Sequence, residues 1–391
     1  MQILADRVIA NAAEAFSNFG DVTLFDGREL DSAMLKNSDA LLIRSVTKVD
    51  AALLASTPIR FVGTATAGTD HVDIKSLERA GITFASAPAC NANAVAEFVV
   101  TSIAMFCVKE RLKVEETRVG IIGHGAVGSR VEQKLLSLGF ECVLNDPFKA
   151  GDNKHKNYVS LDTVIQTDIV TLHTPLTMGG PYPTRRLIDT SQINQMENCR
   201  LLINAARGGI VNEEALAERM GDDPRFNVQL DCWENEPLID RQLIAKTFRA
   251  SPHVAGHSME ARQNATMMLV ESLFRWCHSE PGRRGSARQL SELLSDSKYE
   301  EANKLTFPQG DRSNDSLSGL VQLLGQCCPI DEINNAMLGL ARLPETEVGG
   351  EFDRLRRQFA GRREFTAYQV PIEVSSRFED NTLAELGFRV G

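Results

Sequence analysis

The 391-residue sequence lacks the features that mark membrane-spanning and secreted proteins. No stretch reaches the roughly 18 uninterrupted apolar residues that a membrane-spanning helix needs. The best candidate, residues 94–108, contains Glu97 and two hydroxyl residues, which favours a buried helix. The N-terminus meets Asp6 and Arg7 too early for the apolar core of a secretory signal. These absences predict a cytoplasmic protein with no membrane partner.

Positive charge is also scarce, because Lys and Arg total 42 against 52 Asp and Glu, a formal net charge of −10. Acidic and basic residues are interspersed, which argues against nucleic acid as a partner. The eight cysteines show no Cys-x-x-Cys spacing and no Cys/His cluster typical of a metal site, so we expect no metal. They are interpreted as reduced thiols, although the adjacent Cys327 and Cys328 leave a redox role open.

Short apolar runs alternate with helical patterns along the first ninety residues and again from 117 to about 255. Such alternation predicts βαβ units with parallel sheets. Strands are expected at 3–5, 22–25, 40–43, 61–63 and 82–84, and then at 119–122, 142–145, 168–172, 200–203 and 227–230. The predicted fold class is α/β, with two Rossmann-like parallel-sheet domains and a cleft between them, plus a small α+β C-terminal domain.

Two further helical patterns, at 91–114 and 261–277, suggest where the chain passes between domains. We expect a discontinuous first domain at 1–93 and 256–279 and a second domain at 94–255. After Ser279 the composition shifts to a linker rich in Pro, Gly and Ser. Residues 280–391 are therefore predicted to form the third domain, and no catalytic pattern is visible in them.

A glycine-rich turn follows the predicted strand at 119–122 and opens a helix. Gly123 permits the tight turn, Gly125 lets the backbone approach a pyrophosphate, and Gly128 allows the helix to pack closely on the strand. A tight turn without a ligand is the alternative. Asp146, however, ends the next predicted strand, where a carboxylate binds ribose hydroxyls and repels a 2′-phosphate, so the pattern favours NAD over NADP. The residues assigned to the cofactor here are Gly123, Gly125, Ala126, Val127, Gly128 and Asp146.

Three later turns each place one ionisable residue beside Gly or Pro: Arg207 before a glycine pair, Glu236 before Pro237, and His253 after Pro252. An arginine offers a planar fork to a carboxylate, and a histidine moves a proton. A glutamate orients the histidine and favours its charged form. Together these residues suit the oxidation of an alcohol beside a carboxylate. The plainer alternatives are a surface arginine at a helix end and a structural histidine.

Weaker candidates lie at the ends of other predicted strands. Ser45 and Thr66 offer hydroxyls and free backbone N–H groups, which make anion sites, although ordinary turn residues are the more common interpretation. Thr174, after His173, is placed to line the cofactor site, and the histidines other than His253 are interpreted as structural or surface residues. An arginine cluster in the tail is interpreted as a solvated helical face, with a phosphate contact as the alternative; it comprises Arg354, Arg356, Arg357, Arg362 and Arg363.

Taken together, Asp146 and the segments 123–128, 204–209, 231–237 and 251–256 resemble the D-2-hydroxyacid dehydrogenase family. A closer resemblance, to one branch of this family, is carried by segments 44–49, 61–73, 87–91, 179–182, 350–356 and 362–364. This closer resemblance is dense from residue 1 to about 278, patchy to 348 and clear again at 349–365. It implies NAD-dependent oxidation of 4-phospho-D-erythronate at C2, a step in pyridoxal 5′-phosphate synthesis. It also implies that the substrate-binding domain is the first one, that NAD binds the second, and that the C-terminal domain makes a homodimer.

The resemblance also assigns roles to single residues of this chain. Arg207 and Glu236 become active-site residues and His253 the proton acceptor. The implied substrate contacts are Ser45, Thr66 and His257, a position where the family usually has Tyr. The implied cofactor contacts are Asp146, Thr174, Ala206, Asp231 and Gly256. Two alternatives stay open: a dehydrogenase of another phosphorylated 2-hydroxy acid, such as 3-phosphoglycerate, and a non-catalytic NAD-sensing scaffold.

Overall fold

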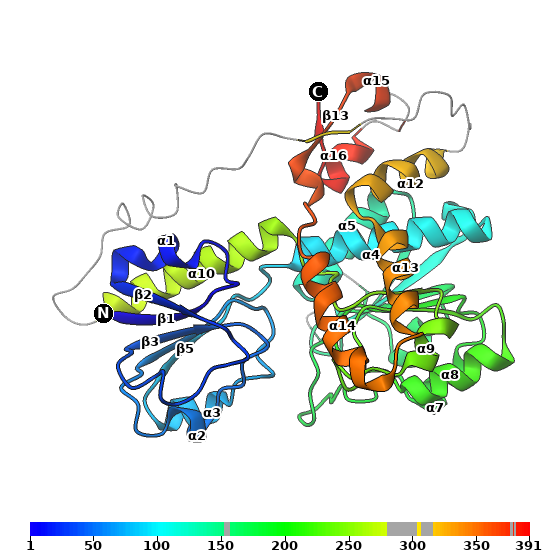
Figure 1. The fold of residues 1–391 in the computed structure, drawn as a ribbon. Helices are drawn as coiled ribbons and strands as arrows, with labels where there is room; N and C mark the ends of the chain where they lie inside the picture. The colour runs from blue at the N-terminus through cyan, green and yellow to red at the C-terminus, as the bar shows by residue number, and fades with distance from the viewer. Residues whose placement is uncertain (152–156, 280–302, 306–315, 376–377, 379–380) are drawn as a thin grey trace. The chain divides into compact units, whose positions relative to one another are not determined.

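The computed structural model describes residues 1–151, 157–279, 303–305, 316–375, 378 and 381–391 (Figure 1). The chain divides into two compact units, which we call the first unit (Met1–Asn91 with Met259–Glu301) and the second unit (Ala92–Ser258 with Ala302–Gly391). Most of the polar segment 280–316 falls outside the described residues. The predicted α/β class is confirmed, because both units are built on parallel sheets.

The first unit holds a five-stranded parallel sheet in the order β2-β1-β3-β4-β5. Its strands are β1 (Gln2–Asp6), β2 (Asp21–Phe25), β3 (Ala40–Ile43), β4 (Phe61–Thr64) and β5 (Thr83–Ala85). β3 is fully buried and central, as expected for a run of four apolar residues. The connecting helices are α1 (Ala12–Phe16), α2 (Ala51–Leu54) and α3 (Ile74–Arg79). α10 (Met259–Cys277) packs back on this sheet and contributes Leu269 and Leu273 to the core that holds Phe61.

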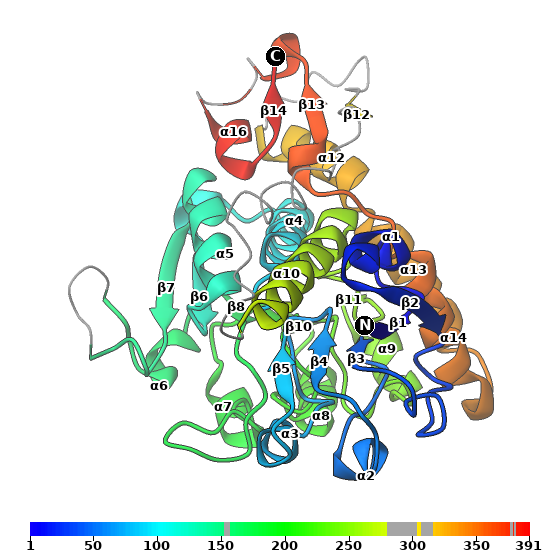
Figure 2. The ribbon, with the colours of Figure 1, turned by 90° about the vertical axis from the view of Figure 1, so that its left-hand side faces the viewer.

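The second unit holds six parallel strands in the order β11-β10-β9-β8-β6-β7, and Figure 2 shows β7 at the outer edge of this sheet. The strands are β6 (Arg118–Ile122), β7 (Glu141–Asn145), β8 (Ile169–Leu172), β9 (Leu201–Asn204), β10 (Asn227–Leu230) and β11 (Arg249–Ala250). The five predicted strands are all present, whereas β11 is too short to show a pattern. β7 pairs with one edge of β6 and β8 with the other, so the strand order reverses at β6. Ligands of open α/β sheets bind at such a switch point, beyond the carboxyl ends of the strands.

Helix α4 (Ala92–Glu110) forms the core of the second unit. Among the described residues it is the one helix long and apolar enough to cross a membrane, yet 78% of its apolar window is buried inside the protein. The prediction of a buried core helix at 94–108 is therefore confirmed. The other helices before residue 258 are α5 (Ala126–Ser137), α6 (Leu161–Val164), α7 (Thr190–Gln195), α8 (Glu213–Asp222) and α9 (Arg241–Lys246).

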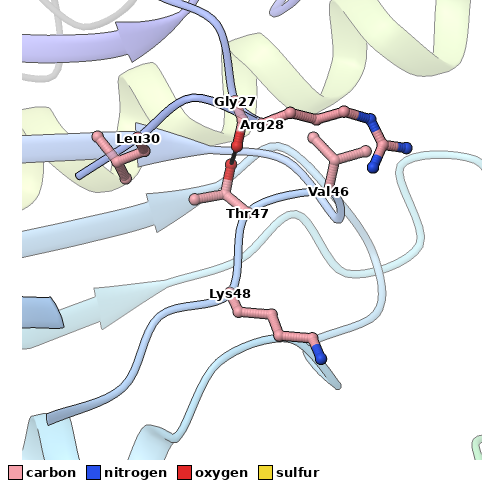
Figure 3. Close-up of a pocket in the computed structure, with 6 residues that line it drawn as sticks. All are labelled: Gly27, Arg28, Leu30, Val46, Thr47 and Lys48. Carbon is pink, nitrogen blue, oxygen red and sulfur yellow. Dashed lines mark hydrogen bonds between the residues drawn. The ribbon is translucent and has the colours of Figure 1, made fainter. Parts of the chain in front are cut away.

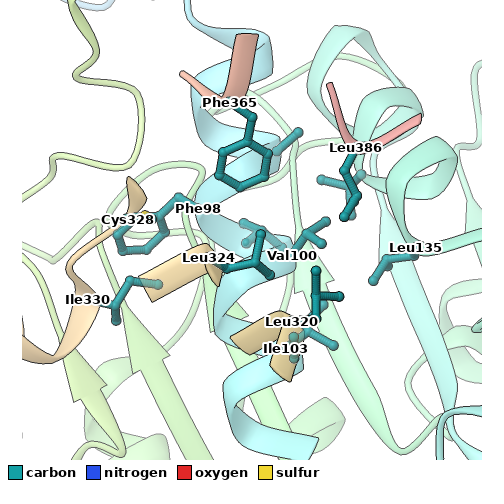
Figure 4. Packing of buried hydrophobic residues seen from close by; sticks show 14 of the residues in the cluster. Phe98, Val100, Ile103, Leu135, Leu320, Leu324, Cys328, Ile330, Phe365 and Leu386 are labelled. Carbon is teal, nitrogen blue, oxygen red and sulfur yellow. The ribbon is translucent and has the colours of Figure 1, made fainter. Parts of the chain in front are cut away.

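Residues 302–391 belong to the second unit rather than forming a compact unit of their own. Their helices are α12 (Ser316–Cys327), α13 (Ile330–Leu340), α14 (Glu345–Gln358), α15 (Ile372–Ser375) and α16 (Thr382–Leu386), with a small parallel sheet of β12 (Asn303–Lys304), β13 (Tyr368–Val370) and β14 (Arg389–Val390). Leu320 and Leu324 of α12, together with Phe365, share one core with Phe98 and Ile103 of α4 (Figure 4). The apolar stripe of α12 is thus buried against the apolar face of α4. This shared core explains why residues 302–391 belong to the second unit.

A buried arginine also ties the tail to α4, and it corrects one prediction. Arg362, expected on a solvated helical face, has a side chain only 4% exposed and forms an ion pair with Glu97 at 3.3 Å. Its guanidinium also donates to the carbonyls of Ala94 at 2.7 Å and Ala255 at 3.0 Å. Burial of its charge is compensated by these acceptors. Arg354, in contrast, lies on the exposed face of α14 as predicted.

Candidate functional site

The glycine-rich turn joins β6, which ends at Ile122, to α5, which has Gly125 as its N-cap. Gly128 lies so close to Gly123 that a Cβ at position 128 would stand 2.1 Å from the Gly123 carbonyl oxygen. Gly125 faces open space, and Ala126 beside it is exposed. The first backbone N–H groups of α5 are therefore open to a phosphate at the positive end of the helix.

Asp146 follows β7 at the same edge of the sheet. One of its carboxylate oxygens accepts the backbone N–H of His124, inside the glycine-rich turn, at 3.0 Å. The other oxygen accepts the N–H of Phe148 at 3.2 Å. These bonds fix the carboxylate beside the turn, where the adenosine ribose of a dinucleotide requires an acceptor.

His124 is structural, as predicted, but it has a partner that the sequence did not reveal. Its ring is buried, with Nε2 2.9 Å from the Glu132 carboxylate and Nδ1 3.0 Å from the Tyr158 hydroxyl. Glu132 lies two helical turns into α5, so the interaction ties the glycine-rich turn to the helix that follows it. Nothing in the local spacing of the two residues signals this pair.

Two buried polar atoms lie without partners just after β8. A Cβ on Gly123 would meet the His173 carbonyl and the Thr174 methyl at 2.8 Å, so this segment lies against the glycine-rich turn. Within the described structure, Thr174 Oγ1 and His173 Nδ1 have no hydrogen-bond partner. Burial lowers the pKa of His173 to about 3, so its ring is neutral. Orphaned buried polar atoms are rare, and these two, with the open turn and Asp146, fit a dinucleotide at the switch point.

Arg207 lies in the loop that follows β9. Asn204 shapes this loop, because its side-chain oxygen accepts the N–H of Ala206 at 3.2 Å and its amide donates to the Arg207 carbonyl at 2.9 Å. The Arg207 side chain is half-buried and donates to the Ala206 carbonyl at 2.7 Å. Gly208 packs on the backbone of Trp233, where an added Cβ would stand 1.9 Å from the carbonyl oxygen. The loop that carries Arg207 is therefore in contact with the turn that carries Glu236.

Glu236 and His253 form a hydrogen-bonded pair with 2.7 Å between Oε2 and Nδ1. The second Glu236 oxygen accepts the N–H of Trp233 at 2.8 Å. Burial raises the pKa of the Glu236 carboxyl, but the charge of His253 and these two hydrogen bonds outweigh burial and hold the pKa below its usual value. An ionised Glu236 accepts the proton on Nδ1, so Nε2 is the nitrogen of His253 that remains for proton transfer.

Asp231, at the end of β10, holds the segment that carries His253. Its carboxylate accepts the Ser251 hydroxyl at 2.7 Å and the N–H groups of Val254 and Ala255 at 2.8 and 3.1 Å. Its backbone carbonyl accepts the N–H of His253 at 2.8 Å. His253 adopts a positive φ of 56°, a conformation that costs free energy for a residue with a side chain. The Asp231 bonds thus fix a strained histidine in one place.

Cys232 lies beside the same pair. Its sulfur and one ligand atom each from Glu236 and His253 all lie within 4.8 Å of one another, a spacing compatible with a metal ion that the sequence did not suggest. Burial raises the pKa of the Cys232 thiol well above its usual value. The thiol is therefore protonated, and it would have to lose that proton before it bound a metal.

His257 lies in a segment that the tail holds on both sides. The preceding Ala255 carbonyl accepts from Arg362 at 3.0 Å, and the following Ser258 hydroxyl donates to Glu364 at 2.8 Å. His257 itself is half-buried. The C-terminal stretch showed no catalytic pattern in sequence. Its side chains nevertheless fix the backbone at Ala255 and Ser258, just after His253.

In the first unit, Ser45 is exposed just after β3. The residues beside it form one wall of a hollow of about 310 Å³, lined by Gly27, Arg28, Leu30, Val46, Thr47 and Lys48 (Figure 3). The Thr47 hydroxyl donates to the Gly27 carbonyl at 2.8 Å and closes one side. Arg28 and Lys48 are the two cationic residues of this lining. Sequence reasoning identified Ser45 but missed these two cations.

The Thr66 hydroxyl is engaged inside its own turn. It donates to the Gly68 carbonyl at 2.7 Å and lies 2.7 Å from the Thr64 hydroxyl, which lies 2.9 Å from His71 Nε2. If Thr66 donates to Gly68, Thr64 donates to Thr66, so the proton of the His71 ring must be on Nε2. These bonds agree with the interpretation of Thr66 as an ordinary turn residue and leave one oxygen lone pair for a ligand.

Two further residues lie near the Glu236–His253 pair: Glu213, which had no sequence signal, and Arg356, which was predicted on a solvated helical face and is half-buried. Glu213, the first residue of α8, accepts the N–H of Glu234 at 2.6 Å, and burial raises its pKa to about 8. Arg356, on α14, lies close enough for its charge to act on Glu236. Both residues reach the pair from other parts of the chain.

The fold and the site define a nicotinamide-dependent dehydrogenase, and comparison with known proteins agrees. Residues 106–255 match the family model described as "D-isomer specific 2-hydroxyacid dehydrogenase, NAD binding domain". The chain belongs to the D-2-hydroxyacid dehydrogenase family and is an NAD-dependent oxidoreductase.

Within this family, the chain is 37% identical over 389 residues to the erythronate-4-phosphate dehydrogenases of Escherichia coli O6:H1 and Shigella boydii serotype 18, across 99% of its own length and 98% of theirs. Among solved structures, it is similar in fold to the D-lactate dehydrogenase of Aquifex aeolicus, solved with NAD and lactic acid, at a TM-score of 0.60 and 20% identity over 75% of this chain and 98% of that one. The NAD-bound 3-phosphoglycerate dehydrogenase of Entamoeba histolytica has a TM-score of 0.59 and 21% identity over 73% of this chain and 98% of that one.

Proposed function

We propose that this protein oxidises 4-phospho-D-erythronate at C2 with NAD to (R)-3-hydroxy-2-oxo-4-phosphooxybutanoate, in the synthesis of pyridoxal 5′-phosphate. The observation that carries the proposal is the hydrogen-bonded pair of Glu236 and His253, 2.7 Å apart, in contact through Trp233 with the Arg207 loop. The similarity to erythronate-4-phosphate dehydrogenases along 99% of the chain supports the choice of substrate.

His253 is the proposed general base. Nδ1 is held by Glu236, so Nε2 takes the proton of the C2 hydroxyl as the alcohol becomes a ketone. The carboxylate of Glu236 stabilises the imidazolium that forms. Because the pKa of Glu236 lies below its usual value, this carboxylate is already charged at neutral pH.

Arg207 is the proposed ligand of the C1 carboxylate, and it stabilises the negative charge that develops on the C2 oxygen. Backbone N–H groups near Gly68 are a second proposed ligand of that carboxylate. NAD, when bound, supplies the acceptor for the C2 hydrogen. The residues proposed to hold it are those of the turn and the strand ends: Gly123, Gly125, Ala126, Val127, Gly128, Asp146, Thr174, Ala206, Asp231 and Gly256.

The remaining proposed contacts lie on the substrate. We assign to it Ser45, Thr66 and His257. At position 257 the family usually has a tyrosine, so in this chain an imidazole takes the place of a phenol. The domain roles follow from the same proposal: 1–93 with 256–279 binds substrate, and 94–255 binds NAD.

We also propose that the protein is a cytoplasmic homodimer that associates through residues 280–391. Support comes from two large apolar side chains that the tail exposes, Ile372 at 65% and Val390 at 46%, the latter on the edge strand β14. Light scattering of the full chain tests this: Ile372→Glu is expected to halve the mass, while Met178→Gln, at an exposed apolar position outside the tail, is expected to leave it unchanged. An unchanged mass in the Ile372 variant would overturn this assignment of the interface.

The substrate assignment is tested by NADH formation with 4-phospho-D-erythronate beside 3-phosphoglycerate. We expect kcat/KM to be higher for the four-carbon phosphate. A preference for 3-phosphoglycerate would assign the chain to the alternative dehydrogenase. Absence of turnover with either acid, while NAD still binds, would support the non-catalytic scaffold.

A further inference from the structure

Helix α14 of the tail lies against the turn that carries Glu236. A Cβ on Gly349 would stand 3.1 Å from Leu238 and 3.5 Å from Pro237, the two residues that follow Glu236. Helical residues seven positions apart lie on the same face. Arg356 therefore projects from the side of α14 that packs on this turn.

The core beneath the turn fixes this arrangement. Phe352 and Leu355 of α14 are buried in the same hydrophobic cluster as Trp233. The backbone N–H of Trp233 donates to the Glu236 carboxylate at 2.8 Å. Helix α14 and the turn that carries Glu236 both belong to the second unit, so they form part of one compact body. The position of Arg356 relative to Glu236 is thus set by packing rather than by the free rotation of a surface arginine.

Arg356 has no hydrogen-bond or ion-pair partner among the described residues. Its side chain is half-buried, its Nε is enclosed without an acceptor, and the described part of the chain provides it with no hydrogen bond or ion pair. The charge of Arg356 nevertheless reaches the site. It is among the groups that lower the pKa values of Cys232 and Glu236 and so oppose the effect of burial on both. Arg354, on the exposed face, is instead paired with Glu351.

We propose that Arg356 binds the phosphate group of the substrate, an inference that rests on the function proposed above. A phosphate monoester carries a charge of about −1.5 to −2 at neutral pH and suits the planar fork of a guanidinium. Arg207 is assigned to the C1 carboxylate, so a second cation is needed for the other end of the molecule. The phosphate is attached two carbons from the reacting C2, which places it near the Glu236–His253 pair. The tail then takes part directly in the choice of substrate.

The test compares wild type, Arg356→Gln, Arg356→Lys and the matched control Arg357→Gln, whose target is the next residue of α14 and is exposed. Two quantities are measured on the full chain: KM and kcat for 4-phospho-D-erythronate, and the inhibition constant of inorganic phosphate. Loss of a charge-assisted hydrogen-bonded contact weakens binding by about 10- to 100-fold. We expect both KM and the phosphate inhibition constant to rise by that factor in Arg356→Gln, with kcat within about threefold. Arg356→Lys is expected to be intermediate and Arg357→Gln unchanged.

A binding readout without turnover separates this proposal from the proposed function. Inorganic phosphate is expected to raise the unfolding temperature of the NADH-loaded wild type and of Arg357→Gln, but not of Arg356→Gln. If the wild type shows this response and yet does not oxidise 4-phospho-D-erythronate, the proposed substrate is wrong and the assignment of Arg356 stands. The assignment is overturned if Arg356→Gln keeps its response to phosphate. It is also overturned if Arg356→Gln loses kcat with KM unchanged, because that result would mean that Arg356 acts only on the charge of Glu236 and does not bind substrate. It is also overturned if Lys48→Gln, in the hollow of the first unit, abolishes the phosphate response and Arg356→Gln does not.

Discussion

Gly208 connects the two halves of the proposed catalytic set, because its backbone packs on the Trp233–Glu234 peptide of the turn that carries Glu236. In Gly208→Ala the new Cβ would stand 1.9 Å from the Trp233 carbonyl oxygen and 2.5 Å from its carbon. Real Cβ atoms stay beyond 3.0 Å of such neighbours. One of the two segments must therefore move by roughly 1 Å, and both touching atoms belong to backbone that cannot rotate away.

This movement falls on the N–H of Trp233, which binds Glu236 at 2.8 Å. Overpacking of this kind costs about 1–3 kcal/mol of unfolding free energy. Misplacement of a catalytic group by about 1 Å lowers turnover by about 10²-fold. For Gly208→Ala we expect both effects, a kcat about 10²-fold lower in NADH formation and a loss of about 1–3 kcal/mol in urea denaturation.

The matched control is Gly221→Ala on α8, where an added Cβ meets nothing within 4 Å. Alanine is favoured over glycine in a helix by up to about 1 kcal/mol, so this variant is expected to keep wild-type kcat and equal or greater stability. A Gly208→Ala enzyme with wild-type kcat would refute the coupling of the Arg207 loop to the Glu236 turn.

Three further predictions concern single side chains. The pKa of Glu213 is raised from 4.5 to about 8, so the free energy of unfolding should fall as pH rises across that range. In Glu213→Gln, this fall between pH 4.5 and 8 should be smaller by up to about 3–5 kcal/mol, as measured by urea denaturation. An unchanged pH dependence would contradict the prediction. Arg362→Met leaves Glu97 buried without its ion-pair partner and should cost about 3–5 kcal/mol in the same assay, whereas the double variant with Glu97→Met should cost less. Asp146→Ser should raise the ratio of kcat/KM for NADP to that for NAD by about tenfold or more, since the carboxylate no longer repels a 2′-phosphate; an unchanged ratio would remove Asp146 from the cofactor site.

The strands and the residues at their ends could be predicted from sequence because both signals are local. Apolar runs mark β6 to β10 of the second unit, and parallel strands bring their carboxyl ends to one edge of the sheet. Arg207 and Asp231 follow β9 and β10, two strands that pair in parallel, so both residues lie at the carboxyl edge of the sheet. Pro and Gly beside Glu236 and His253 marked turns, and the structure brings these two side chains together.

The contributions of the tail could not be predicted in this way. Arg362 pairs with Glu97 across more than 260 positions, and its sequence neighbours are those of a surface arginine. Whether an arginine such as Arg356 faces solvent or a turn depends on which helix face packs, and the polar stripe of α14 does not show that. The glycines that permit the contact, Gly208 and Gly349, are recognisable as sites of close approach only once the opposing backbone is known.

The central claim is that His253, held by Glu236, moves the proton of the C2 hydroxyl. His253→Ala tests it most directly, with initial rates of NADH formation from 4-phospho-D-erythronate and the dissociation constant of NADH measured on the same preparation. General acid–base catalysis contributes about 10²–10⁴-fold, so we predict a fall in kcat of that size with NADH binding unchanged. A variant that binds NADH and turns over at a near-wild-type rate would contradict the account.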